Sequence, residues 1–235
     1  MQHIIHKAED RGHANHGWLD TWHSFSFAGY YNPSKIHFGA LRVINDDTIA
    51  PGMGFGTHPH DNMEIITIPL EGAVKHADSA GHEEVIGVNE VQVMTAGSGI
   101  QHSEFNASQS ETLKLLQIWI FPDEKNLQPG YSQYRYSESE FHNQIKPVVG
   151  GRKVDAPLKI HQNTVISMGK FDAGQTVEYT FSDETNGLYT YLIEGEVEID
   201  DKKLSRRDAI GIWETETIKL NISKDAHILF LEIPK

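Results

Sequence analysis

One stretch of this chain occurs twice, about half a chain length apart, and this repeat limits the folds that the chain can adopt. The stretch from Thr57 to Val74 aligns without a gap on the stretch from Thr180 to Val197. Both copies contain the turn sequence Glu-Gly-x-Val, which sets the register of the alignment. The alternative explanation is chance similarity between two β-hairpins. A repeat at this spacing favours two similar domains in tandem.

Short apolar and β-branched segments separated by turn residues run through most of the chain. Ile65 to Leu70 is a predicted strand, with Pro69 at an edge or bulge position. Phe38 to Ile44 is another, and we expect it to end in a turn at Asn45-Asp46-Asp47. Such regular spacing of short strands and turns predicts an all-β fold, a sandwich or a barrel, rather than an α/β fold.

Two histidine-containing segments in the first half have the pattern of a metal site. Side chains two apart on a strand point to the same face, so His58 pairs with His60, and His102 pairs with Glu104. Glycines flank both segments, which allows a strand end to approach a bound ion closely. A single His-x-His is more often part of a polar network. The two pairs together predict a site with four ligands, His58, His60, His102 and Glu104.

Three imidazoles and a carboxylate form a nitrogen and oxygen donor set without thiolate, which suits Fe(II), Mn, Ni, Cu or Zn. Four protein ligands leave two octahedral positions open. A reactive metal needs such positions, because substrate and a small molecule such as O2 or water must bind it directly.

The second copy of the repeat has lost these ligands. His58 aligns with Phe181 and His60 with Asp183, and no histidine lies between Gly195 and Ala226, where a counterpart of His102 is expected. We therefore expect one metal per chain, in the N-terminal half.

The composition also divides the chain. Residues 123–151 are polar and end in Gly150-Gly151, and Gln133 to Phe141 has the character of a short helix or a linker. We predict an N-terminal metal-binding barrel over residues 1–122, a linker over 123–151, and a C-terminal barrel without metal ligands over 152–235.

Charge and cysteine content exclude several classes of protein. The formal net charge of −13 disfavours direct binding of nucleic acid. The absence of cysteine rules out disulfides and fits a reducing compartment. We expect a cytoplasmic protein without membrane association, since neither a signal-peptide core nor a span-length apolar stretch occurs in the sequence.

The two histidine segments resemble the two sequence motifs of the cupin superfamily, whose members are double-stranded β-helix (jelly-roll) barrels. The first segment matches at Gly52, His58 and His60, and the second at Gly99, His102 and Asn106. Two positions depart from the pattern. Glu64 falls one residue before the usual ligand glutamate, and Gly97 replaces the usual proline. Together with the repeat, the resemblance implies a bicupin, and the shifted position of Glu64 counts against it as a ligand.

Within the cupins, four runs resemble the pirin family: 11–20, 22–27, 41–47 and 54–60. The resemblance covers nearly the whole chain and is strongest over residues 9–122. In pirin-like proteins three histidines and the glutamate two residues after the third hold the metal, which implies His58, His60, His102 and Glu104 here. The resemblance and the strand spacing thus select the same four residues.

The resemblance also implies function. Pirin-like proteins are associated with quercetin 2,3-dioxygenase activity, which opens the ring of a flavonol with O2 and releases carbon monoxide. On this reading Glu104 is both a ligand and the catalytic base. Eukaryotic pirin-like proteins are also described as iron-dependent transcriptional co-regulators, so the alternative is a redox-sensing regulatory protein that acts through protein partners. We expect a monomer with one divalent metal, Fe(II) first, and Mn, Ni, Cu or Zn as alternatives.

Overall fold

The computed structural model describes residues 1–152 and 154–235, and Lys153, which falls in the expected C-terminal barrel, lies outside them. In this described part the chain is almost entirely β, and its only helices are two 3₁₀ turns, Ala8–Asp10 and Glu138–Glu140. No helix among these residues is long and apolar enough to cross a membrane. The expected all-β class is confirmed.

The chain forms two compact units. The N-terminal unit contains residues 12–136 and 160–162, and the C-terminal unit contains residues 1–11, 137–159 and 163–235. The expected boundaries at 122 and 152 therefore differ from these units. The first eleven residues belong to the C-terminal unit, and most of the expected linker belongs to one unit or the other.

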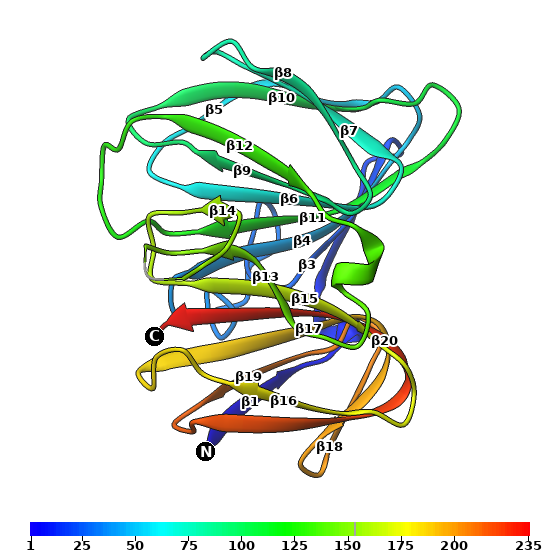
Figure 1. Ribbon diagram of the computed structural model, residues 1–235. Coiled ribbons are helices and arrows are strands. Elements are labelled where there is room, and N and C mark those ends of the chain that lie inside the picture. Colours follow the sequence, from blue (N-terminus) through cyan, green and yellow to red (C-terminus); the bar gives the residue numbers. More distant parts are fainter. Residues whose placement is uncertain (153) are drawn as a thin grey trace. The chain divides into compact units, whose positions relative to one another are not determined.

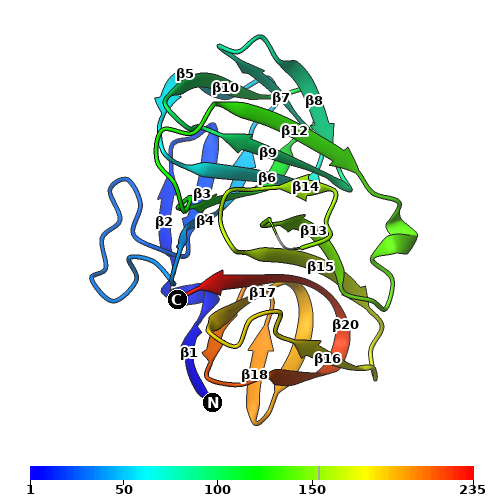
Figure 2. The same cartoon turned by 60° about the vertical axis from the view of Figure 1, so that its left-hand side comes forward.

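Two sheets build the N-terminal unit. A seven-stranded sheet has the order β12-β9-β6-β11-β4-β3-β2, and a four-stranded sheet has the order β5-β10-β7-β8. The strands are β2 (Gly12–Asn15), β3 (Leu19–His23), β4 (Leu41–Ile49), β5 (Gly54–His60), β6 (Glu64–Glu71), β7 (Ala73–Asp78), β8 (Glu83–Gly87), β9 (Glu90–Thr95), β10 (Ile100–Asn106), β11 (Leu113–Ile120) and β12 (Gly130–Arg135). Figure 2 shows the loop between β3 and β4 projecting from this unit.

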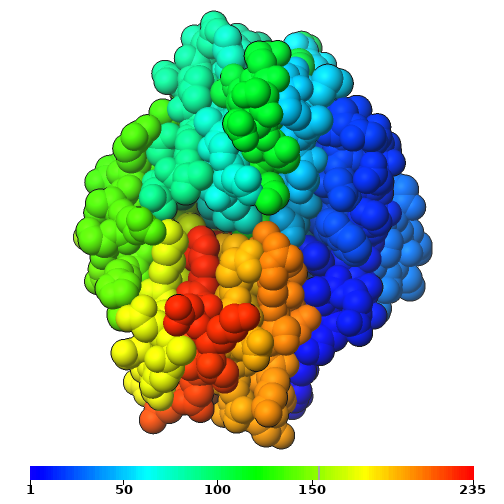
Figure 3. All heavy atoms as spheres, turned by 90° about the vertical axis from the view of Figure 1, so that its right-hand side faces the viewer, coloured from blue at the N-terminus to red at the C-terminus, as the bar shows by residue number. Residues whose placement is uncertain are grey.

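One nine-stranded sheet builds the C-terminal unit, with the path β1-β19-β17-β20-β15-β13-β14 and with β16 and β18 attached to β20 and β17. The strands are β1 (Gln2–His6), β13 (Lys146–Gly150), β14 (Leu158–Lys159), β15 (Val165–Phe171), β16 (Thr176–Thr180), β17 (Asn186–Ile199), β18 (Lys202–Ser205), β19 (Ala209–Trp213) and β20 (Thr217–Pro234). In the space-filling view, atoms of the last strand (red) lie beside yellow and orange atoms of the same unit (Figure 3).

Strand pairing explains why the two units differ from the boundaries that composition suggests. The first strand, β1, pairs along its whole length with β19, so the N-terminus covers an edge of the C-terminal sheet (Figure 1). Strand β12 pairs with β9, from Gly130 opposite Thr95 to Arg135 opposite Glu90. The polar composition of 123–136 is that of an edge strand and its approach, and the expected short helix is reduced to the 3₁₀ turn Glu138–Glu140.

Two other local expectations can be compared with the structure. Pro69 lies on β6, an interior strand of the sheet, beside an irregularity in the pairing of β6 with β11. The predicted bulge position is therefore confirmed, and the predicted edge position is not. The turn expected at Asn45-Asp46-Asp47 is wrong, because β4 continues through it to Ile49. Asn45 and Asp47 are buried there and bond to side chains of β3, which makes polar residues acceptable inside the sheet.

The repeat is visible as a repeated turn. Gly72 and Gly195 both have positive φ, 76° and 99°. A Cβ would lie 3.0 Å from the Thr112 carbonyl oxygen at the first glycine and 2.2 Å from the Asp225 carbonyl oxygen at the second. Glycine is therefore required twice by the same close approach to a neighbouring strand. Phe181, the counterpart of His58, lies in the apolar core of the C-terminal unit and packs edge-on against Tyr179.

Candidate metal centre

Neighbouring strands β5 and β10 bring the three predicted histidines together. His58 and His60 lie two apart on β5, and His102 of β10 is directly opposite His58 in the antiparallel register. Gly54 makes the approach of the strands possible, because a Cβ there would lie 2.2 Å from the carbonyl oxygen of Glu104. The two-residue spacing of His58 and His60 on β5 and the close approach at Gly54 thus bring the three imidazoles together.

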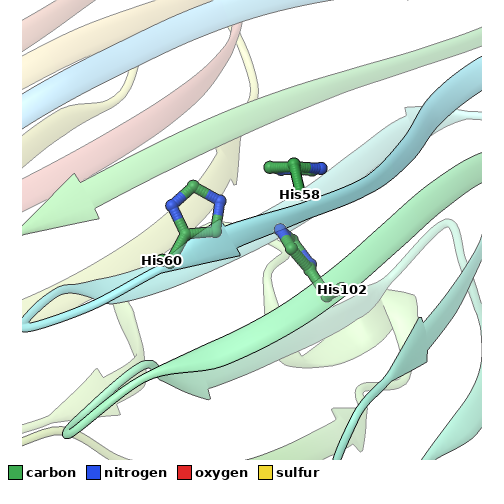
Figure 4. Close-up of side chains that lie close together, drawn as sticks. All are labelled: His58, His60 and His102. Carbon is green, nitrogen blue, oxygen red and sulfur yellow. The ribbon is translucent and has the colours of Figure 1, made fainter.

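The three histidines form what we call the outer cluster. One ring nitrogen from each of His58, His60 and His102 lies within 4.8 Å of the other two. The ring centroids are 4.5 to 4.9 Å apart. Figure 4 shows the rings converging from β5 and β10. A 2.8 Å hydrogen bond joins Nδ1 of His58 to the carbonyl oxygen of Gly56, which leaves Nε2 of His58 as the available ligand atom.

Burial and the neighbouring histidines favour neutral rings at His60 and His102. Burial, with repulsion from His58, lowers the pKa of His60 to about 4. Burial, followed by repulsion from His58 and His60, lowers the pKa of His102 to about 3. Both ring nitrogens of His102 are buried and have no hydrogen-bond partner among the described residues. Such orphaned polar atoms cost stability unless a ligand satisfies them, so these residues fit a metal.

Glu104, the fourth predicted ligand, lies deeper in the same unit. It accepts hydrogen bonds from the hydroxyl of Thr67 at 3.1 Å and from the side-chain amide of Gln117 at 2.8 Å. Burial raises the pKa of Glu104 to about 7, although these two hydrogen bonds lower it. Glu104 therefore ionises near neutral pH, which suits a group that must both bind a cation and accept a proton.

A second cluster, the inner cluster, consists of His76, His102 and Glu104. One ligand atom from each residue lies within 4.8 Å of the other two, and His102 belongs to both clusters. Glu104 is not grouped with His58 and His60 at that distance. The four predicted ligands are thus divided between two overlapping clusters, and the inner cluster also contains His76, which was not among the predicted ligands. The sequence feature that could have identified His76 is its position two residues before Asp78 at the end of a strand.

Glu64 has a different environment. It is fully buried on β6 and accepts hydrogen bonds from the hydroxyl of Thr95 at 2.7 Å and from the backbone N–H of His161 at 2.9 Å. The ring of His161 lies 3.0 Å from the same carboxylate. Glu64 therefore holds the returning segment 160–162 onto the N-terminal unit, and it is outside both histidine clusters.

A row of polar side chains crosses the seven-stranded sheet beneath the clusters. The cross-strand register aligns one residue from each of six adjacent strands, namely His23, Asn45, Gln117, Thr67, Gln92 and Gln133. Within this polar row, Thr67 and Gln117 bond Glu104 of the opposite sheet, and Gln92 contacts His76 at 3.4 Å. In the sequence, several apolar strands each contain one polar residue, as Thr67 does between Ile65 and Ile68. This pattern could have identified the polar row.

The outer cluster opens into a cavity of about 660 Å³. Aromatic and apolar side chains cover much of its wall, among them Phe27, Tyr30, Phe55 and Trp119. His60 packs edge-on against Trp119 with centroids 4.9 Å apart. A polar part of the wall contains Asp47, whose pKa burial raises to about 7 and which accepts a hydrogen bond from Thr21. The cavity can hold a flat aromatic molecule next to the histidines.

A tandem pair of β units, of which only the N-terminal one carries a histidine cluster among the described residues, defines a bicupin with one candidate metal centre. Comparison with known proteins agrees, because the family described as Pirin matches residues 5–120 and the Quercetinase C-terminal cupin domain matches residues 148–233. The chain belongs to the pirin family.

Relatives and solved structures extend this match along the whole chain. The chain is 42% identical over 230 residues to the "Quercetin 2,3-dioxygenase" of Escherichia coli K12, covering 98% of each chain. It is 37% identical to a "Pirin-like protein" of Caulobacter vibrioides, covering 94% of this chain and 95% of that one. The crystal structure of "bacterial pirin YhhW in complex with nickel(II)" from Escherichia coli matches with a TM-score of 0.93 and 41% identity, covering 99% of each chain.

Proposed function

We propose that this protein is a metal-dependent dioxygenase that opens the ring of a flavonol such as quercetin. One observation carries the proposal: an outer cluster of three histidines beside the buried carboxylate of Glu104 lies at an aromatic-walled cavity of about 660 Å³. The names of the relatives support the reaction class, since the Escherichia coli protein at 42% identity is called quercetin 2,3-dioxygenase.

We propose His58, His60, His102 and Glu104 as the metal ligands. The orphaned nitrogens of His102 and the lowered pKa values of His60 and His102 support this assignment, because a ligand imidazole must be neutral. The nickel(II) complex of the Escherichia coli pirin supports a divalent ion. Fe(II) is our first candidate, and the donor set also accommodates Mn, Ni, Cu and Zn. The stoichiometry should be one ion per chain.

The side chains then have separate tasks. When bound, a divalent transition metal supplies a Lewis acid and open positions for a chelating substrate and O2. The three histidines hold it, and Phe55 and Trp119 enclose the aromatic rings of the flavonol. Glu104 takes the proton from the substrate 3-hydroxyl, and the hydrogen bonds from Thr67 and Gln117 keep its carboxylate in place.

The test is turnover of a flavonol under O2 after loading the metal-free protein with Fe(II), Mn, Ni, Cu or Zn in turn. We expect oxygen consumption and carbon monoxide release well beyond the amount of bound metal. The variant H58A/H60A is the control, because it removes two proposed ligands and leaves the aromatic side chains of the cavity wall in place. Absence of turnover with every metal, in protein that binds the metal, would contradict the dioxygenase and favour the iron-dependent regulatory alternative.

A further inference from the structure

The inner cluster has the properties of a metal position in its own right. His76 of β7 lies directly opposite Glu104 of β10 in the register of the four-stranded sheet. His76, His102 and Glu104 are 0%, 1% and 3% exposed, and one ligand atom from each lies within 4.8 Å of the other two. We propose that these three residues form an inner metal position, which the ion occupies in alternation with the outer cluster.

The hydrogen bonds of His76 prepare one of its nitrogens for a metal. Nε2 of His76 lies 3.1 Å from the carboxylate of Asp78, whose side chain is fully buried. Asp78 is itself held by the backbone N–H groups of Ala80 and His82, at 2.9 and 3.1 Å. A carboxylate that accepts one ring N–H leaves the other nitrogen as a lone pair, which is the arrangement that accompanies metal-binding histidines. Nδ1 of His76 has only a long 3.4 Å contact with Gln92.

Glu104 can serve this position without losing its supports. Thr67 donates to one carboxylate oxygen and Gln117 to the other. Each oxygen has a further lone pair, so both hydrogen bonds and a metal bond can coexist. The inner cluster contains two imidazoles and one carboxylate, a donor set known for divalent iron. The negative charge of the Glu104 carboxylate offsets the desolvation of a buried cation.

Sharing of His102 makes the two positions exclusive. A neutral imidazole has a lone pair on only one nitrogen at a time, so His102 binds an ion in the inner cluster or in the outer cluster. The outer cluster lines the cavity, and so do His102 and Glu104 of the inner cluster, whereas His76 is buried and is not among the lining residues. An ion can therefore reach the inner position from the cavity, and the stoichiometry remains one per chain.

The experiment separates the positions with Co(II) as the probe, using equilibrium dialysis with elemental analysis and the visible absorption of bound Co(II). The double variant H58A/H60A removes the outer cluster. We expect it to bind Co(II) more weakly than wild type, but to reach about one ion per chain at saturating Co(II), with an altered spectrum. Adding H76Q to this background should weaken binding at least about ten-fold, since the loss of even an indirect partner of a metal site costs roughly 10–100-fold.

The matched control is H58A/H60A/H37A, because His37 is exposed and its ring bonds only the carbonyl of Gly39 among the contacts described. This variant should bind Co(II) as H58A/H60A does. Thermal unfolding of each variant without metal identifies any loss of fold.

The inference rests on the metal binding in the proposed function, and different results would overturn each of them. Two results would overturn the inner position alone. In the first, wild type binds Co(II) but folded H58A/H60A does not. In the second, the H76Q and H37A triple variants bind Co(II) with equal affinity. Wild type that binds no Co(II) would overturn both.

Discussion

The side-chain amide of Gln117 donates a 2.8 Å hydrogen bond across the interior of the N-terminal unit to the carboxylate of Glu104. Gln117 lies on β11 of the seven-stranded sheet, and Glu104 lies on β10 of the four-stranded sheet. This contact connects the polar row to the candidate metal centre. It helps to hold a buried carboxylate in place, because Glu104 also accepts a hydrogen bond from Thr67 on its other oxygen.

Replacing Gln117 with leucine should therefore weaken metal binding without removing a ligand. The hydrogen bond from Gln117 lowers the pKa of Glu104, so its loss favours the protonated carboxyl, which competes with the metal. We expect roughly 10–100-fold weaker binding at pH 7. Titration calorimetry with Ni(II) measures this, and Q133L at the far end of the polar row is the control. Equal affinities of wild type and Q117L would show that this contact has no part in the metal centre.

The variant E104Q should separate metal binding from chemistry. The amide keeps an oxygen that can coordinate, and the hydroxyl of Thr67 can turn to accept from the new amide, so part of the metal should remain. The variant loses the capacity to take a proton, which should slow flavonol turnover by roughly 10²–10⁴-fold. Raising the pH should partly restore the rate, because more substrate arrives ionised. Turnover per bound metal over a pH series is the measurement, and equal rates at matched occupancy would remove Glu104 as the base.

Metal affinity should depend on pH through Glu104 in the range below neutrality. Glu104 has a pKa of about 7, whereas His60 and His102 have pKa values of about 4 and 3. As the pH falls from 7 toward 5, only the carboxylate among these three takes up a proton that the metal must displace. The affinity should then fall by about ten-fold per pH unit. In E104Q this dependence should be nearly absent, and a steep profile in that variant would assign the proton to another group.

Substitution of His60 should reduce metal binding, whereas substitution of Glu64 should reduce stability. H60A should lower metal occupancy strongly, because it removes a ligand of the outer cluster. E64Q should keep the metal and lose stability, about 1–3 kcal/mol, since Glu64 is fully buried and accepts hydrogen bonds from Thr95 and His161. Elemental analysis and chemical unfolding distinguish the two. Equal loss of metal in both variants would return Glu64 to the ligand set.

Asp47 should make the metal-free protein less stable as the pH rises. Burial raises its pKa from 3.8 to about 7, so the folded state holds this proton more tightly than the unfolded state. The contribution is fully present below pH 4 and is lost as the pH rises through 7. D47N keeps an oxygen for the Thr21 hydroxyl and has no proton to lose. Its melting temperature should fall less than that of wild type between pH 5.5 and 8.5, measured with a chelator present, and parallel profiles would contradict this.

The sequence by itself determined the features that depend on residues close together in the chain. Period-two spacing placed His58 with His60 on one strand face, and the structure keeps that spacing on β5. The repeated Glu-Gly-x-Val turn indicated the tandem architecture. Glycine occurs in both copies because Gly72 and Gly195 both have positive φ. The sequence also showed that the second copy lacks counterparts of the predicted ligands, since an apolar residue, Phe181, aligns with His58.

Only the tertiary structure decided which distant residues meet. Local periodicity says which face a side chain occupies, but hydrogen bonds between strands decide which strands are neighbours, and those pairings link segments far apart in sequence. Thus β1 joins the last strands of the chain, and Glu64 binds His161, 97 residues away. The split of the candidate ligands into an outer and an inner cluster depends on the register of β10 with both β5 and β7, which places His58 beside His102 and His76 beside Glu104. No local pattern encodes that register, because it results from packing two sheets around one interior.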